Sequence, residues 1–291
     1  MLLFKNLTRL ASSIGGVTLS MVAAGQALAQ EVPFRGEPHD GGWHHQEAAT
    51  SLAEEAFWID NALLYLITAI TIFVCALLLW VIVFHNRRVN PTPARFTHNS
   101  PLEVAWTILP IFILVAIGAV TVPALFKSQI MPEAEVTVKV TGYQWYWGYE
   151  YVDHGVEFSS YMLERDELEE FGYEPRHYLL ATDTQVVVPV GSNVVMQITG
   201  ADVIHSWAIP AFGVRQDGVP GRLAQLWFNV DEPGIFFGQC SELCGQGHSY
   251  MPIVVRAVPE ADYVAWLQEQ GAENLAAAPG YDATIQLAAS E

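Results

Sequence analysis

The chain has 291 residues, of which 52% are hydrophobic and only 15% charged, and its formal net charge is −18. So few charges over this length indicate that part of the chain avoids water. The strongly acidic balance argues against a nucleic-acid partner.

Residues 1–29 have the pattern of a secretory signal peptide. Lys5 and Arg9 precede an apolar run over residues 14–24, and the Ala-Leu-Ala sequence that ends at Ala29 suits signal peptidase. We therefore expect cleavage before Gln30. The alternative is an uncleaved membrane anchor, although the apolar run is short for a hydrocarbon core about 30 Å thick.

Residues 61–84 and 104–126 each lack Asp, Glu, Lys and Arg over a length that can cross a bilayer as a helix. A helical hairpin buried in a soluble core would normally show a polar face, so we predict two transmembrane helices. Residues 30–58 show too little periodicity for a secondary-structure prediction, and we place the segment before the first helix, residues 30–60, in the periplasm.

The loop between the two helices, residues 85–103, sets the orientation. It carries Arg87, Arg88 and Arg95, and its one acid, Glu103, lies at its far end. The positive-inside rule puts this loop in the cytoplasm. Both termini are then periplasmic, and the chain is a two-pass protein of a bacterial inner membrane.

The exported domain, residues 127–258, is predicted to be all-β. Short runs rich in Val, Ile, Thr and aromatic residues are separated by Gly and Pro, which is typical of a sandwich or barrel. An acidic helix over residues 163–171 interrupts this pattern. The final segment, residues 259–291, is predicted to form a helix up to Gln270 and then a tail. The predicted strands are residues 136–141, 144–151, 186–190, 193–199, 226–230, 235–239 and 253–257.

The exported part is strongly acidic. From residue 127 to the end there are 7 Lys and Arg against 23 Asp and Glu, a net charge of −16. Such a surface would attract a basic protein at a rate that falls with salt. The alternative is that the acids only keep the domain soluble.

One loop concentrates metal-binding side chains. Cys240, Cys244, His248 and Met251 lie within twelve residues, and soft sulfur ligands with imidazole favour copper. A disulfide or a zinc site is the alternative, but a disulfide explains neither His248 nor Met251, and zinc disfavours a thioether. A further ligand should come from elsewhere, and His205, which we place at the end of a strand-like run, is the best candidate.

The segments Cys-Ser-Glu-Leu-Cys-Gly-x-x-His-x-x-Met (240–251), Val-Ile-His-Ser-Trp (203–207) and Gln-Trp-Tyr-Trp (144–147) together resemble subunit II of cytochrome c oxidases. The two apolar helices and the segments 95–103 and 219–222 follow the order of that family. The resemblance implies a two-helix transmembrane hairpin followed by a cupredoxin-like Greek-key sandwich with a binuclear copper centre, CuA.

The resemblance also implies ligands for that centre. Cys240 and Cys244 would bridge two coppers, and His205 and His248 would bind one each. Met251 and the backbone carbonyl of Glu242 would be weak ligands.

The resemblance further implies an electron-transfer route. Trp145 would receive electrons from a cytochrome c that docks on acidic residues, and the electrons would then pass to haem in subunit I. Subunits I and III would be the partners of this chain. No Cys-x-x-Cys-His sequence occurs here, so the cytochrome should be a separate protein. The acids that match the docking positions are Glu150, Glu157, Asp183 and Asp202.

Two glutamates match further positions of the family. The side chain of Glu242 would help to bind Mg²⁺ or Mn²⁺ at the border with subunit I, and carboxylates suit such hard cations. Glu103 would lie at the mouth of a proton pathway, although without the resemblance it reads as an ordinary interfacial acid.

Two rival functions use similar folds. A quinol oxidase subunit would lack copper, and the complete set of copper ligands argues against it. A free-standing copper module, such as a nitrous-oxide reductase-like domain or a copper-delivery protein, would not need two membrane helices and Trp145.

Overall fold

The computed structural model describes residues 32–92 and 94–281. The predicted signal peptide and its cleavage site lie outside the described residues, as does the end of the C-terminal tail.

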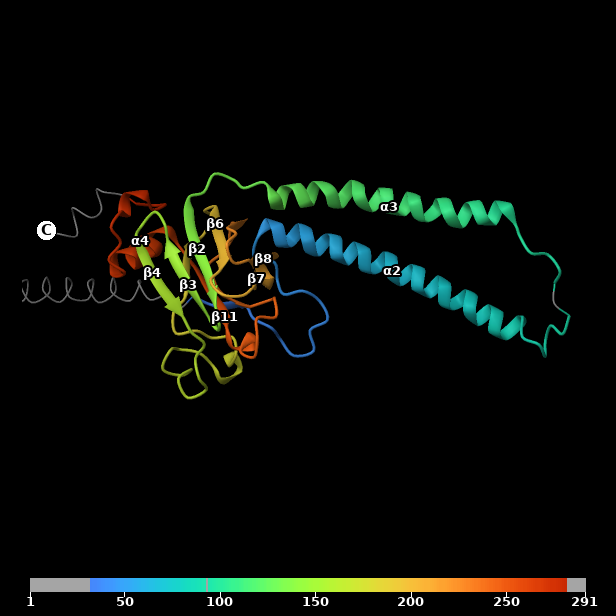
Figure 1. The fold of residues 1–291 in the computed structure, drawn as a ribbon, viewed down its shortest axis with the longest axis horizontal. Coiled ribbons are helices and arrows are strands. Elements are labelled where there is room, and N and C mark those ends of the chain that lie inside the picture. The colour runs from blue at the N-terminus through green and yellow to red at the C-terminus, as the bar shows by residue number, and fades with distance from the viewer. Residues whose placement is uncertain (1–31, 93, 282–291) are drawn as a thin grey trace, which may run out of the picture. The chain divides into compact units, whose positions relative to one another are not determined.

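Two long apolar helices, α2 (Ser51–Phe84) and α3 (Ser100–Gln129), contact each other and are long enough to cross a membrane (Figure 1). In the most apolar 18-residue window of each helix, no residue is buried within the chain. Such extended apolar surfaces are stable only against lipid or the helices of a partner protein.

Helix α2 begins ten residues before the predicted span, because Thr50 caps it. The Thr50 hydroxyl oxygen accepts a hydrogen bond from Ala53 N at 3.1 Å and donates one to the carbonyl oxygen of Phe212 at 2.8 Å. Glu54, Glu55 and Asp60 interrupt the apolar pattern in the first turns, so this helix start could not be predicted from that pattern.

Helix α3 begins at Asn99, whose side chain and backbone N–H both form capping hydrogen bonds. Asn99 Oδ1 accepts from Leu102 N at 3.3 Å, and Glu103 Oε1 accepts from Asn99 N at 3.0 Å. Reciprocal bonds of this kind satisfy two backbone donors that a helix start leaves free.

In the described part of the chain, the β domain contains two larger sheets and one hairpin, with both parallel and antiparallel pairs, and all of its strands except β1 follow α3. Three of its strands, β2, β3 and β4, lie side by side in Figure 1. The first sheet has the order β1 (Phe34–Gly36), β10 (Gly234–Gln239), β11 (Pro252–Val258) and β5 (Val186–Pro189). The second has the order β4 (Val156–Ser160), β3 (Tyr146–Tyr151), β2 (Val136–Tyr143), β6 (Val194–Gly200) and β9 (Ala224–Phe228), and the hairpin pairs β7 (His205–Ile209) with β8 (Val214–Gly218).

Aromatic side chains join the two sheets. The Phe212 ring lies 4.8 Å from that of Phe228 on β9 and 4.9 Å from that of Phe236 on β10. The buried Tyr151 hydroxyl donates to the Val187 carbonyl at 2.7 Å and accepts from Val187 N at 2.9 Å, which links β3 to β5. The predicted β-sandwich is therefore confirmed.

The predicted acidic helix over residues 163–171 is wrong, because this segment forms turns. Its apolar side chains Leu163 and Leu168 pack with Tyr173 against Phe237 and Val254. Burial of these side chains outweighs the helical preference of the glutamates between them. The later helix, α4 (Glu260–Glu269), forms as predicted and buries Tyr263 and Leu267.

Four strands were absent from the prediction: β1, β4, β7 and β8. Each is short, between three and five residues. His205 is the first residue of β7 instead of the end of a strand.

Candidate metal centre

The hairpin of β10 and β11 holds the ligand loop. Gln239 pairs with Pro252 in the ladder, so the loop that starts at Cys240 returns to the same place at Met251. The backbone N–H of Cys240 donates to Met251 O at 3.4 Å, and Ser241 N donates to the carbonyl of Ser206 on β7 at 2.9 Å. Strand β7 thereby brings His205 to the loop.

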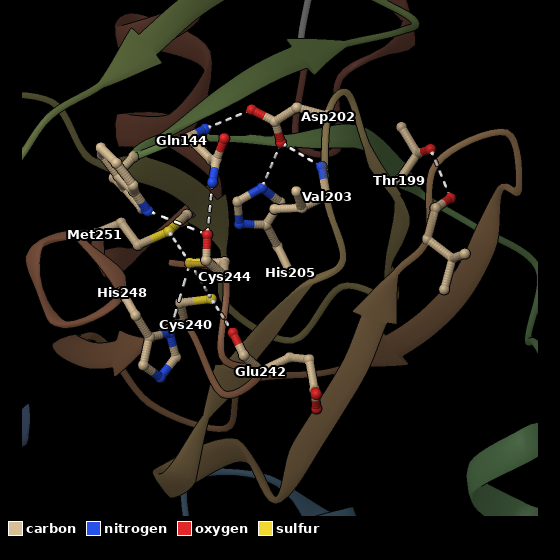
Figure 2. Close-up of polar contacts among 12 residues, drawn as sticks. Gln144, Thr199, Asp202, Val203, His205, Cys240, Glu242, Cys244, His248 and Met251 are labelled. Atoms are coloured by element: carbon tan, nitrogen blue, oxygen red, sulfur yellow. Dashed lines mark hydrogen bonds and ion pairs between the residues drawn. The ribbon is translucent and has the colours of Figure 1, made fainter. Parts of the chain in front are cut away.

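The side chains of this loop converge on the two cysteines (Figure 2). The Cys240 and Cys244 sulfurs are 3.9 Å apart, and the Glu242 carbonyl oxygen lies 3.3 Å from Cys240 Sγ. Cys244 Sγ lies 3.6 Å from His248 Nδ1 and 3.5 Å from Met251 Sδ. Five of the six ligand groups predicted from the sequence thus lie together in this loop, and the sixth, His205, comes from strand β7.

His205 presents a free nitrogen to this site. Its side chain is fully buried, its Nε2 atom lies 2.8 Å from Asp202 Oδ1, and its Nδ1 atom has no hydrogen-bond partner in the described structure. The ligand atoms of His205, Cys240 and Cys244 lie within 4.8 Å of one another. A buried nitrogen without a partner is costly, so a bound metal would satisfy it.

Close packing on β2 holds the His205 ring. A Cβ atom added at Gly142 would come within 2.7 Å of His205 Cγ. Any residue larger than glycine would therefore displace the ring. This role of Gly142 was not predicted from the sequence.

The two cysteines differ in acidity without a metal. Burial opposes ionisation of Cys240, but the neighbouring His205 ring and hydrogen bonds with backbone groups outweigh it and lower the pKa of that thiol. Burial and the neighbouring Cys240 raise the pKa of Cys244. Burial alone would lower the pKa of His205, yet its contacts with Cys240 and Asp202 raise it. The site therefore favours one thiolate beside a histidine, which suits a cationic metal.

The donor set fits copper better than the alternatives. The cysteines are free, and a sulfur separation of 3.9 Å is far from a disulfide bond of about 2.05 Å. Two thiols, two imidazoles and a thioether are soft or intermediate ligands, which favour copper, and zinc sites rarely use a thioether.

Trp145 lies directly on the ligand loop. Its indole N–H donates to the Cys244 carbonyl oxygen at 3.3 Å, and Gln144 Nε2 donates to the same oxygen at 2.8 Å. A Cβ atom at Gly247 would overlap the Trp145 ring, so only glycine permits this contact. Trp145 also lines a shallow surface depression with Gly247 and Tyr250, so it joins the surface to a cysteine of the cluster.

The acids predicted to dock a partner have different surroundings. Glu150 pairs with Lys139 at 2.7 Å and lies opposite Glu157 across β3 and β4. Asp183 accepts a hydrogen bond from Tyr161 N at 2.8 Å. Asp202 is turned toward His205, and its other oxygen accepts from Gln144 N at 2.8 Å. This inward contact of Asp202 was not predicted from the sequence.

The two remaining glutamates lie apart from the sulfur cluster. The Glu242 carboxylate, on the ligand loop, pairs with Arg215 at 3.3 Å and is partly exposed. The Glu103 side chain accepts a hydrogen bond from the N-cap backbone N–H of α3, at Asn99.

Family models identify both parts of the chain. Residues 136–258 match the model described as cytochrome C oxidase subunit II, periplasmic domain, and residues 38–124 match its transmembrane domain. The chain is 54% identical over 278 residues to cytochrome c oxidase subunit 2 of Cereibacter sphaeroides, which covers 90% of this chain and 91% of that protein. The chain belongs to the cytochrome c oxidase subunit II family.

Other members of the subunit II family give similar matches. The chain is 43% identical over 228 residues to cytochrome c oxidase subunit 2 of Drosophila subobscura, which covers 77% of this chain and 95% of that protein. Among solved structures, the periplasmic domain of subunit II of cytochrome oxidase of Bradyrhizobium japonicum is 45% identical, covers 49% of this chain and 97% of that one, and has a TM-score of 0.45.

Membership of the subunit II family sets the chain's context. It is part of a haem-copper oxidase complex, with subunit I as a partner. It is a two-pass membrane protein with a periplasmic domain.

Proposed function

We propose that this chain receives electrons from a cytochrome c at a CuA centre and passes them to haem in subunit I, where oxygen is reduced to water. The observation that carries the proposal is the convergence of two cysteines, His205, His248 and Met251 on one buried site.

The positions of the donor atoms support the ligand roles that the family resemblance implies. Cys240 and Cys244 would share two coppers, and His205 Nδ1 and His248 Nδ1 would each bind one. Met251 Sδ and the carbonyl oxygen of Glu242 would complete the set as weak ligands. Copper held by shared thiolates supplies a one-electron carrier that does not need a substrate-binding position.

The surrounding protein is suited to fast electron transfer. Cys240, Cys244 and Met251 are at most 6% exposed, which excludes water from their sulfur atoms. Backbone bonds at Cys240 and Ser241 tie the loop to Met251 and to β7. A loop fixed in this way moves little when its charge changes, which keeps the reorganisation energy low.

Trp145 would receive electrons from cytochrome c. It is partly exposed at the surface depression, and its indole N–H contacts the carbonyl of Cys244. The acids Glu150, Glu157, Asp183 and Asp202 would attract the basic face of the cytochrome.

Further proposals concern the border with subunit I and the membrane. The Glu242 carboxylate would bind Mg²⁺ or Mn²⁺ there, exchanging its contact with Arg215 for a hard cation. Glu103 would lie at the cytoplasmic mouth of a proton pathway. The membrane would be the bacterial inner membrane, with both termini in the periplasm.

Copper analysis with electron paramagnetic resonance tests the CuA centre. The purified full chain, loaded with copper in detergent, should hold two coppers and give a mixed-valence signal. Cys240→Ser should abolish that signal. Cys75→Ser is the matched control, because Cys75 is exposed on α2 and should leave the signal unchanged.

Three results would contradict the proposal. One copper per chain with a four-line mononuclear signal would indicate a simple copper site. Zinc in the native complex, or a disulfide between Cys240 and Cys244 there, would indicate a structural site.

A further inference from the structure

A second site lies where the two sheets meet at their edges. Strand β5 ends the order of one sheet and β4 ends the order of the other. The Thr184 hydroxyl donates to Ser159 O at 3.0 Å, and the Ser160 hydroxyl donates to Thr184 O at 3.2 Å, so these edges approach each other just before β5. Helix α4 contacts β5 and closes this seam.

The seam contains a cavity of about 230 Å³. Trp266 of α4 forms one wall, where its ring lies 5.0 Å from that of Tyr151 and edge-on to Phe158 at 6.4 Å. The other side chains that matter here are polar. They are Thr184, Gln185, Arg256 and Gln270.

Arg256 is the only charged side chain that lines the cavity among the described residues. Its Nε atom is buried without a hydrogen-bond partner, and it forms no ion pair with any residue that the structure describes. A buried cationic donor without a partner is costly, so an anion in the cavity would stabilise it.

The lack of a partner is unusual in so acidic a domain. Of the seven basic residues after residue 126, four pair with carboxylates: Lys127, Lys139, Arg176 and Arg215. Arg165 lies 3.7 Å above the Tyr178 ring. Arg222 also lacks a described ion pair, but it is exposed to solvent. Among the described basic residues of this part of the chain, Arg256 alone combines a buried, unbonded guanidinium nitrogen with the absence of a carboxylate partner, although acids outnumber bases by 23 to 7.

We propose that this cavity binds a small organic oxyanion. The carboxylate or phosphate group would meet the planar guanidinium of Arg256, which can donate two parallel hydrogen bonds. The amides of Gln185 and Gln270 would donate to remaining oxygens. The apolar body of the ligand would lie against Trp266 and Phe158.

Binding of two defined probes to the purified full chain tests the site. Benzoate carries a carboxylate and phenyl phosphate a phosphate group on the same phenyl ring. The ratio of their dissociation constants therefore shows which group the site prefers. At least one should bind with a dissociation constant of about 1 mM or lower, measured by calorimetry and by tryptophan fluorescence. Inorganic phosphate should bind more weakly, because it has no apolar body.

Substitutions locate the binding. Arg256→Gln should weaken the better probe at least about tenfold, since a hydrogen bond to a charged group is lost. Arg222→Gln removes the same charge elsewhere and should leave binding unchanged. Gln270 is exposed and lines the cavity, so Gln270→Glu places a carboxylate there and should also prevent binding of the probe. This variant keeps the test possible even if Arg256→Gln does not fold.

Each remaining outcome overturns the proposal. Absence of binding by both probes would exclude the site. Unchanged binding in a folded Arg256→Gln protein, or in Gln270→Glu, would place the probe elsewhere. Inorganic phosphate that binds as tightly as phenyl phosphate would exclude a role for the aromatic wall.

Discussion

Asp202 Oδ1 lies 2.8 Å from His205 Nε2, while the opposite nitrogen of the same ring faces the two cysteines. A carboxylate in this position fixes the orientation of a metal-binding histidine and makes it a better ligand. Asp202 therefore positions His205, in addition to any role in docking a partner.

Asp202→Asn should weaken copper binding by about tenfold or more, because the ring of His205 loses its charged partner. Copper retention against a chelator of known affinity measures this effect. Asp183→Asn is the matched control, since Asp183 contacts Tyr161 and no proposed ligand. Equal copper affinity in the two variants would exclude the positioning role.

Trp145→Phe should slow the oxidation of cytochrome c while copper content and the paramagnetic signal stay unchanged. The variant keeps an aromatic ring over Gly247 but loses the hydrogen bond to Cys244 O. Stopped-flow absorbance of the reduced cytochrome measures the rate in the purified complex.

Two further variants test whether the placement of the Trp145 ring matters for the rate. Gly247→Ala should also slow the reaction, because its methyl group overlaps the indole ring. Trp43→Phe, at a side chain that is 93% exposed, should have no effect. Full activity in both Trp145→Phe and Gly247→Ala would show that electrons reach the loop by another route.

Salt should slow the reaction with cytochrome c. Raising the ionic strength from about 0.01 M to 0.15 M shortens the Debye length from about 30 Å to about 8 Å, so attraction to the acidic domain weakens. Stopped-flow rates at several salt concentrations measure the slope. Asp183→Asn should reduce that slope, whereas Glu269→Gln on α4 should not. A rate independent of salt would contradict electrostatic docking.

Thr50→Val should lower the free energy of unfolding by about 1–2 kcal/mol, because both a helix cap and a buried hydrogen bond are lost. Thermal unfolding of the detergent-solubilised chain measures the change. Thr71→Val is the control, since the Thr71 hydroxyl bonds only to Ile67 O on the exposed surface of α2. An unchanged unfolding temperature would mean that Thr50 contributes little to the junction.

The sequence predicted those parts of the fold that have a strong local pattern. Both apolar helices were visible because a membrane helix needs about 20 apolar residues. Each of the seven predicted strand ranges overlaps a strand. Strand β4 was not predicted, because Glu157 and two serines replace the usual apolar residues on an edge strand.

In the candidate metal site, too, the residues with a strong local pattern were predicted and the contacts that depend on tertiary packing were not. Four proposed ligands lie within twelve residues, so their chemistry could be read directly from the sequence. His205 was placed with them by its position in the family motif, since its distance from the loop depends on how β7 packs. The contacts of Gly142, Gly247 and Asp202 could not be predicted, because each depends on a neighbour far away in the chain or on a turn geometry.

The length of strand β7 sets the distance between the proposed ligand His205 and the anchor of α2. His205 stands at its first residue, and the 3₁₀ turn that follows Ile209 ends at Phe212, whose carbonyl binds the cap of α2. A strand rises by roughly 3.3 Å per residue and reverses its faces at each step. One inserted residue would therefore lengthen the spacing between ligand and anchor and turn His205 away from the cysteines.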